Sequence, residues 1–156
     1  MEQNDDIFMS EALRYAQMAL ECGEVPVGAV IIKDGELLCG AHNLRETDNV
    51  ATAHAELLAI EEACRILGSW RLTGCSLYVT LEPCPMCSGA IVNSRIERVI
   101  YGAKDPLAGC CGSLLNLNAY PFNHSFSLKQ GVMEKECGEL LQKFFEEKRK
   151  QRKFKK

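Results

Sequence analysis

The sequence has no apolar run that approaches the roughly 20 residues needed to cross a membrane. Its first residues, Met1 to Asp6, are acidic and polar, so they lack the basic and apolar regions of a secretion signal. Internal repeats, low-complexity segments and signs of a second domain are also missing. These absences predict a soluble, cytoplasmic protein that has no membrane partner.

What the sequence does contain suits one globular domain over residues 1–156, with 47% hydrophobic and 25% charged residues. Its nine cysteines are an odd number, and without a secretion signal a disulfide framework is not expected. Most of them should be small buried hydrophobes, including the adjacent Cys110 and Cys111. Only Cys84 and Cys87 have the spacing of metal ligands.

The charge is distributed unevenly along the chain. Residues 143–156 hold eight Lys/Arg and two Glu, whereas residues 1–142 hold ten basic and nineteen acidic residues, although the net charge is only -3. Such a basic C-terminal helix or tail is able to bind a polyanion, because phosphate neutralisation releases counterions. From charge alone, a solvated terminal helix is an equally good interpretation.

Hydrophobic periodicity and turn signals predict the order of the elements. Asp5 or Asp6 would start the first helix, Gly23 would end it, and Asp34-Gly35 would join two antiparallel strands. Later strands separated by helices imply parallel pairing. We expect a three-layer αβα fold of the α/β class, with a mixed five-stranded sheet and helices on both faces. The predicted helices are 7–22, 53–67, 84–94 and one from 134 onward, and the strands are 27–32, 36–41, 76–81, 98–102 and 127–132.

Two short motifs carry the chemistry, His54-Ala55-Glu56 and Pro83-Cys84-Pro85-Met86-Cys87, each at the start of a predicted helix. A helix N-terminus stabilises the thiolates that bind metal. Two thiolates and one imidazole, from Cys84, Cys87 and His54, favour zinc and leave a fourth position open for water, as in catalytic sites. A structural site would need a fourth ligand. The candidates are His42, His124, Cys110 and Cys111, and none lies in a second metal-spaced motif.

Glu56 distinguishes a catalytic site from a structural one. Two residues after His54, its carboxylate can reach a metal-bound water without binding the metal, which suits a general acid and base. The alternative is a glutamate that merely complements the helix dipole.

Together the two motifs resemble the H-x-E and P-C-x-x-C signature of the cytidine and deoxycytidylate deaminase superfamily. Over almost the whole chain, the sequence is similar to the bacterial tRNA adenosine deaminases. The stretches that carry this similarity include 24–30, Asn43, 51–56, 77–84, 94–96, 101–105, 112–114, 123–124 and 144–145.

This resemblance implies a cytidine-deaminase-like fold, a homodimer with one Zn²⁺ per subunit, and hydrolytic conversion of the wobble adenosine of an arginine tRNA to inosine. The anticodon stem-loop would be the partner. Glu56 would protonate N1 of adenine and then the leaving amino group, and backbone N–H groups around Ala55 and Cys84 would orient the water.

The resemblance also assigns residues to the RNA. Asn43 would bond the buried base, Asp105 would contact the neighbouring nucleotide, and Phe145 and Arg149 would lie on an RNA-binding helix. Without it, Asn43 and Asp105 are ordinary turn residues. Phe144 or Phe145 would be a core anchor of the last helix, and His124 is as readily a surface residue as a substrate contact. The chain departs from the family at Cys110-Cys111, where small residues are common.

Two other functions remain open from the sequence. One is deamination of a free base or nucleotide, such as guanine or deoxycytidylate, by the same zinc chemistry. The other is a non-catalytic RNA-binding module that keeps zinc only for folding.

Overall fold

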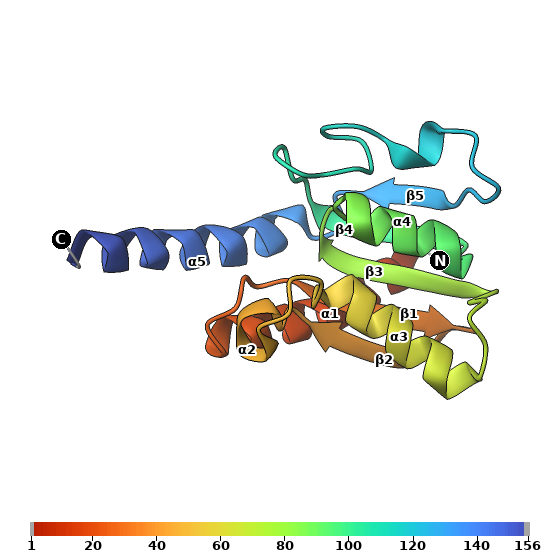
Figure 1. The fold of residues 1–156 in the computed structure, drawn as a ribbon, viewed down its shortest axis with the longest axis horizontal. Helices are drawn as coiled ribbons and strands as arrows, with labels where there is room; N and C mark the ends of the chain where they lie inside the picture. Colours follow the sequence, from red (N-terminus) through yellow and green to blue (C-terminus); the bar gives the residue numbers. More distant parts are fainter. Residues whose placement is uncertain (1, 155–156) are drawn as a thin grey trace.

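The structure is a computed structural model that describes residues 2–154, so Met1, Lys155 and Lys156 of the predicted domain and tail lie outside it. Helices and strands alternate along most of the chain (Figure 1). The helices are α1 (Glu2–Glu21), α2 (Arg45–Asp48), α3 (Ala55–Leu67), α4 (Pro85–Ser94), the 3₁₀ helix η1 (Leu117–Ala119) and α5 (Glu134–Phe154). The strands are β1 (Gly28–Lys33), β2 (Glu36–His42), β3 (Cys75–Leu81), β4 (Arg98–Ala103) and β5 (Ser127–Gln130).

The five strands form one mixed sheet in the order β2-β1-β3-β4-β5. β1 is antiparallel to both β2 and β3, whereas β3, β4 and β5 run parallel to one another. Asp34 and Gly35 join β1 to β2 and both have positive φ, at 52° and 76°, as a tight two-residue hairpin turn requires. The predicted mixed sheet is therefore confirmed.

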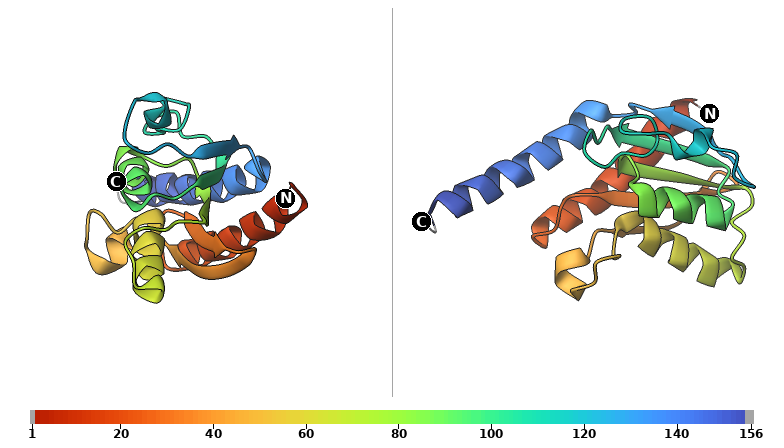
Figure 2. Two further views of the ribbon diagram at one scale, coloured as in Figure 1. Left: turned by 90° about the vertical axis from the view of Figure 1, so that its right-hand side faces the viewer. Right: turned by 45° about the horizontal axis from the view of Figure 1, so that its top comes forward.

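Helices cover both faces of the sheet. α3 and α4 pack on one face, and α1 packs on the other beside the start of α5 (Figure 1). The rest of α5 projects away from the sheet as a single long helix, which Figure 1 and the right-hand view of Figure 2 show. This arrangement confirms the predicted three-layer fold.

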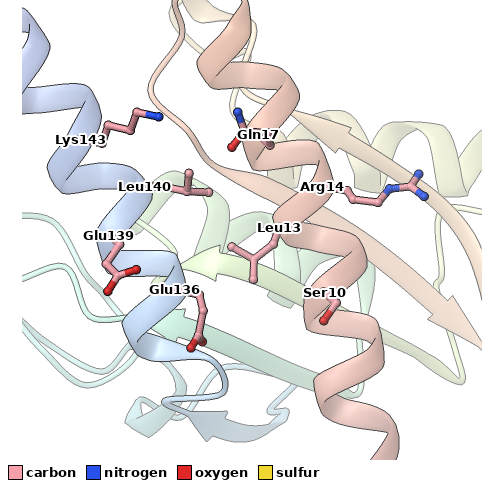
Figure 3. A pocket seen from close by; sticks show the side chains of 8 residues that line it. All are labelled: Ser10, Leu13, Arg14, Gln17, Glu136, Glu139, Leu140 and Lys143. Carbon is pink, nitrogen blue, oxygen red and sulfur yellow. The ribbon is translucent and has the colours of Figure 1, made fainter.

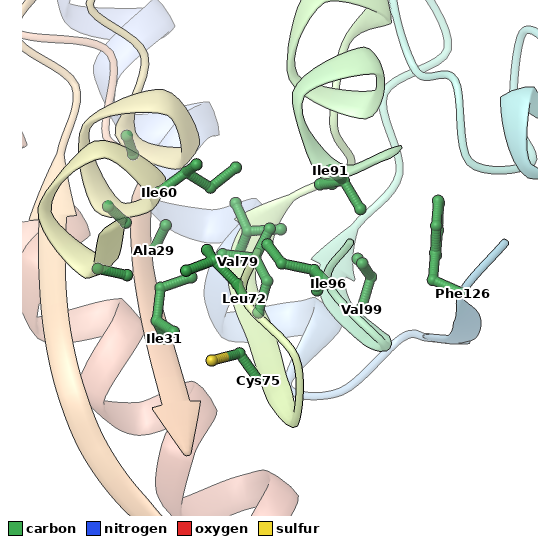
Figure 4. Close-up of a cluster of buried hydrophobic side chains, with 14 of the residues drawn as sticks. Ala29, Ile31, Ile60, Leu72, Cys75, Val79, Ile91, Ile96, Val99 and Phe126 are labelled. Carbon is green, nitrogen blue, oxygen red and sulfur yellow. The ribbon is translucent and has the colours of Figure 1, made fainter. Parts of the chain in front are cut away.

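Alternation along the strands explains the two cores, because successive side chains point to opposite faces. Ala29, Ile31 and Val79 point toward α3 and α4, in the cluster that Figure 4 shows. Val30 and Ile32, which alternate with Ala29 and Ile31 along β1, pack against α1 and α5 instead. β1 is buried on both faces, which accounts for its unbroken apolar sequence.

The first helix begins earlier than predicted, at Glu2, so neither Asp5 nor Asp6 caps it. Asp5 instead turns inward with 1% of its surface exposed and accepts hydrogen bonds from Arg98, Lys129 and Tyr78. Burial alone would raise the pKa of Asp5, but these bonds hold it well below its usual range. The capping prediction was wrong because Asp5 instead forms a buried ion pair with residues of distant strands.

Other differences are local. α3 begins at Ala55 rather than residue 53, and β5 ends at Gln130, where Gly131 turns the chain with φ of 84°. α2 and η1 were not predicted, because helices of four and three residues give too short a periodic signal.

The cysteines follow the prediction, since all nine are free and six are buried. Cys110 and Cys111 are among the buried ones, and burial raises the pKa of Cys111 to about 12. Both are therefore neutral thiols. In the part of the chain that the structure describes, no helix combines the length and apolarity that a membrane span needs.

Candidate active site

A cavity of about 220 Å³ opens where β2, β3 and β4 end. In sheets of this kind, ligands bind in the crevice outside the carboxyl ends of the strands. Six of the nine residues predicted for the site line it: Asn43, His54, Ala55, Glu56, Cys84 and Asp105. Its other lining residues are Glu24, Val25, Val27, Arg45, Glu46, Leu81, Glu82 and Ala108.

The predicted metal ligands meet at one point. The Sγ atoms of Cys84 and Cys87 each lie 3.6 Å from Nδ1 of His54, and the three ligand atoms are all within 4.8 Å of one another. A tetrahedral zinc with bonds of about 2.3 Å to sulfur and about 2.0 Å to nitrogen separates such atoms by roughly 3.5 Å. The donor set and its spacing therefore fit zinc.

Local structure explains this convergence. His54 is the N-cap of α3 and Cys84 the N-cap of α4, and neither uses its side chain to cap the helix. Pro85 occupies the first turn of α4, where its missing N–H is not needed. Cys87, one turn further on, directs its sulfur to the same point.

The pKa values of the two sulfurs shift in opposite directions, as expected when two close thiols share one proton. A hydrogen bond from the Cys87 thiol lowers the pKa of Cys84 to about 4, and the hydrogen bond to Cys84 together with burial raises the pKa of Cys87. A divalent cation that replaced this proton would leave both sulfurs as thiolates, which is the form that binds metal.

Glu56 lies in the first turn of α3 and is only 4% exposed, although it lines the cavity. Burial raises its pKa to about 7, which places the carboxyl near the pH at which a general acid and base is most effective. A glutamate that only complemented the helix dipole would stay in solvent. The environment of Glu56 thus favours the catalytic interpretation.

Asn43 and Asp105 line the cavity from opposite loops. Asn43 is 7% exposed, and its Oδ1 accepts a hydrogen bond from the backbone N–H of Arg45 at 3.1 Å. Oδ1 of Asp105 accepts from the backbone of Leu107 at 3.0 Å and of Ala108 at 3.2 Å. Both are thus turn residues that also line the cavity, and their contacts with RNA stay a prediction.

Phe145 and Arg149 lie outside the cavity, in a groove of about 650 Å³ beside α5. Val25 and Glu46 line both spaces, so the groove adjoins the cavity. The remaining lining residues of the groove are Gly23, Phe144, Lys148 and Arg152. The structure therefore places a basic surface with an exposed aromatic ring next to the metal ligands.

No fourth His, Cys or carboxylate joins the three metal ligands among the residues that the structure describes. His124 hydrogen-bonds the backbone O of Ile96 at 2.6 Å and does not line the cavity. His42 contacts the backbone O of Asn43 at 2.9 Å. Cys110 and Cys111 also stay apart from the group. The group thus has the three ligands of a catalytic zinc site.

The sequence did not point to two buried carboxylates that line the cavity, Glu24 and Glu82. Burial alone would raise the pKa of each, but hydrogen bonds from Thr47 to Glu24 and from Ser113 to Glu82, with others from the backbone, hold both below their usual range. The available signal was one glutamate next to each of two apolar stretches, Glu24 before 25–32 and Glu82 after 77–81.

A second hollow of about 500 Å³ lies between α1 and α5 (Figure 3). Leu13 and Leu140 face one another there, with Arg14, Glu136 and Lys143 around them. It has no cysteine or histidine, so it does not compete with the metal site.

Comparison with known proteins agrees with this geometry. Residues 2–103 match the cytidine and deoxycytidylate deaminase zinc-binding region. The tRNA-specific adenosine deaminase of Bacillus subtilis is 55% identical over 150 residues, which cover 96% of this chain and 93% of that protein. The chain belongs to the tRNA-specific adenosine deaminases.

Comparison with solved structures leads to the same family. A structure from a study of A-to-I editing by tRNA:A34 deaminases at the wobble position of transfer RNA is 44% identical, with a TM-score of 0.84 over 86% of this chain and 98% of that one. The guanine deaminase of Bacillus subtilis is 43% identical with a TM-score of 0.60, over 63% of each chain. The likeness to the tRNA deaminase is the more extensive of the two.

Proposed function

We propose that the protein hydrolyses the wobble adenosine in the anticodon of an arginine tRNA to inosine and ammonia. The observation that carries this proposal is the position of Glu56, buried in a cavity beside three zinc-type ligands and next to a basic groove. The family to which the chain belongs supports the same reaction.

His54, Cys84 and Cys87 would hold one Zn²⁺ per chain, since their donor atoms fit its bond lengths. When bound there, zinc acts as a Lewis acid that lowers the pKa of water toward about 7. Three ligands from the protein would leave room at the metal for a water molecule, as in catalytic zinc sites.

Glu56 would move the protons. It accepts a proton from the attacking water and passes it to N1 of adenine as oxygen bonds to C6. It then takes the remaining proton of that oxygen, which becomes the carbonyl oxygen, and delivers it to the amino group. The C6–N bond breaks, ammonia leaves and the ring becomes that of inosine. Burial helps this residue to exchange a proton, because it destabilises the charged carboxylate. Backbone N–H groups at Ala55 and Cys84 would orient the water.

The base would enter the cavity extruded from a single-stranded loop, as enzymes that act on bases require. Asn43, at the end of β2, would hydrogen-bond its edge, and Asp105, after β4, would contact the neighbouring nucleotide. Phe145 and Arg149 would bind the RNA outside the cavity, where the ring is 46% exposed.

Other functions fit the geometry less well. Free guanine has no anionic group for the basic groove to bind, and deoxycytidylate has only one phosphate, whereas the groove holds Lys148, Arg149 and Arg152. A module that kept zinc for folding has no use for a buried glutamate beside an open metal position.

The direct test is inosine formation by the zinc-loaded protein on an arginine tRNA with a wobble adenosine. The same tRNA with guanosine at that position is the matched control, and free adenosine, cytidine and guanine are run beside it. Inosine in the adenosine tRNA alone is the expected result. Ammonia from free guanine, with none from tRNA, would reject the proposal in favour of a free-base deaminase.

We further propose that residues 1–156 act as one deaminase domain, with 143–156 as its RNA-binding tail, and that the chain forms a cytoplasmic homodimer. Several large apolar side chains are exposed in the single chain, among them Trp70 at 55% and Leu114 at 59%, which supports a partner surface. Nine unpaired cysteines suit a reducing compartment. Light scattering of the purified protein measures its mass, and a monomer would contradict the dimer.

A further inference from the structure

We propose that Glu24 and Glu82 are positioning residues, which hold the two walls of the base cavity in place from inside the protein. This inference rests on the proposed function, because it concerns how the same cavity keeps its shape. Neither residue would touch the reacting atoms.

Both carboxylates are buried in an unusual way. Glu24 is 0% exposed and Glu82 is 2% exposed, whereas buried glutamates normally pair with a cation. Neither forms a salt bridge with a lysine or arginine within residues 2–154. Their partners are backbone N–H groups and hydroxyls of two loops. The loops, rather than a counter-ion, therefore account for the burial.

Glu24 holds the first wall of the cavity, which is formed by α2. Its Oε1 accepts the backbone N–H of Glu46 at 3.0 Å, and its Oε2 accepts the N–H and hydroxyl of Thr47, each at 2.5 Å. These groups belong to α2, whose four residues are too few to be stable as an isolated helix. α2 brings Arg45 and Glu46 to the cavity. Glu24 thus fixes a segment that lines the cavity and has little support of its own.

Glu82 holds the opposite wall. Its Oε1 accepts the backbone N–H of Asp105 at 3.1 Å and the Ser113 hydroxyl, and its Oε2 accepts the N–H groups of Cys111 and Ser113, both at 3.0 Å. These four bonds span the irregular loop that follows β4. Asp105 and Ala108 of this loop line the cavity.

Gly109 shows how closely this wall fits. A Cβ at position 109 would lie 2.4 Å from Cδ of Glu82 and 2.5 Å from the backbone O of Asp105, so any side chain would push the loop from the carboxylate. Four hydrogen bonds hold the Glu82 carboxylate in place, so it cannot move aside for a side chain at position 109.

A carboxylate can only accept hydrogen bonds, so the isosteric amide is a sharp probe. Glutamine would turn an N–H₂ group toward backbone N–H donors and would leave some of them unpaired. The metal ligands lie at the starts of α3 and α4, outside both walls, so zinc binding should be retained. Loss of either carboxylate would therefore misplace the base and leave zinc binding and RNA binding in α5 intact.

The experiment compares Glu24→Gln and Glu82→Gln with wild type in zinc content, melting temperature, tRNA Kd and single-turnover rate constant at saturating enzyme. The rate constant per folded, zinc-containing molecule should fall roughly 10- to 100-fold, as for substrate misplacement of about 1 Å, with Kd within about threefold. Asp5→Asn is the matched control. It also disrupts a buried carboxylate, but one that is absent from the cavity, and its rate constant should equal that of wild type.

Milder variants cover the case in which a glutamine variant fails to fold. Thr47→Ala and Ser113→Ala each remove one hydroxyl bond at an exposed position, and each should lower the rate constant by a few fold. Amide exchange gives a second readout. It should accelerate at residues 45–48 in Thr47→Ala and Glu24→Gln, and at 105–113 in Ser113→Ala and Glu82→Gln.

Unchanged rate constants per folded molecule in all four variants would overturn the inference and show that the carboxylates only stabilise the fold. Failure of the proposed function looks different, because wild type itself would then make no inosine from tRNA. If wild type instead released ammonia from guanine, the same variants would be compared on guanine, and equal rate constants would again reject the positioning role.

Discussion

The rings of Phe144 and Phe145 meet edge to face, with centroids 5.3 Å apart and planes at 81°, yet they belong to different environments. Phe144 is 8% exposed, whereas Phe145 is 46% exposed and lines the basic groove with Arg149. Phe144 is therefore the core anchor of the pair, and Phe145 has the exposure that its proposed RNA contact needs. Adjacent substitutions can test this division.

Phe144→Ala should destabilise the protein by about 3 kcal/mol, because it removes a buried aromatic side chain. Phe145→Ala should change stability by less than about 0.5 kcal/mol but weaken tRNA binding by about tenfold, as loss of a stacking platform does. Urea unfolding and tRNA titration measure the two effects. The reverse pattern, with Phe145 carrying the stability, would contradict the assignment.

Glu56→Gln should retain zinc and lose inosine formation by at least about 10²-fold, because the amide cannot exchange the proton. Metal analysis of the purified variant gives the zinc content, and a timed tRNA assay gives the rate. Glu61→Gln, on the same helix but outside the cavity, is the control and should behave as wild type. A fully active Glu56→Gln would remove this residue from the mechanism.

Cys87→Ser should lower the zinc content and activity together, because a hydroxyl is a poor substitute for a thiolate ligand. A chelator should produce the same loss in wild type, and added zinc should restore activity there. Cys22→Ser replaces an exposed cysteine away from the metal group and should keep full zinc content. Full zinc occupancy in Cys87→Ser would exclude it as a ligand.

Arg149→Ala should weaken tRNA binding more at low salt than at high salt. Removal of one phosphate contact should reduce the slope of log K against log salt by about 0.7 to 1. Arg14→Ala removes an equal charge from α1, outside the basic groove, and should leave the slope unchanged. Equal slopes for wild type and Arg149→Ala would show that this side chain does not neutralise a phosphate.

Asp5→Asn should destabilise the protein by about 2 kcal/mol at neutral pH. This is a modest figure for a buried ion pair, because Arg98 and Lys129 remain about one-third exposed. The pKa of Asp5 is lowered by folding, so its contribution is fully present above its unfolded pKa of about 3.9 and is lost as pH falls below it. The difference between variant and wild type should therefore shrink below about pH 4 in urea titrations. A constant difference down to pH 2 would contradict the ion-pair origin.

Local patterns predicted the elements that have a clear period or turn, and they placed His54 and Cys84 at helix starts. The fold follows from those patterns, whereas the family follows from the resemblance of the two motifs and of longer stretches to known deaminases. Local patterns missed the contacts between residues that are far apart in the sequence. Asp5 was assigned to a helix cap because its partners, Arg98 and Lys129, lie on strands that a periodic pattern does not bring to it.

The walls of the cavity were missed for the same reason. Glu24 and Glu82 each stand in a mostly apolar stretch, where sequence alone does not distinguish a buried acceptor from an exposed charge. Their partners lie 22 to 31 residues away, in the short helix α2 and in the loop that follows β4. Only the folded arrangement shows that these segments face one cavity.

The hydrogen bonds of Asp5 also bear on the order of folding. Its partners Arg98 and Lys129 follow it by 93 and 124 residues in the chain. Until β4 and β5 have formed, the carboxylate on α1 lacks both cations, and contacts between residues so far apart in sequence form slowly. We therefore expect the ion pairs that join α1 to β4 and β5 to be among the later contacts of folding.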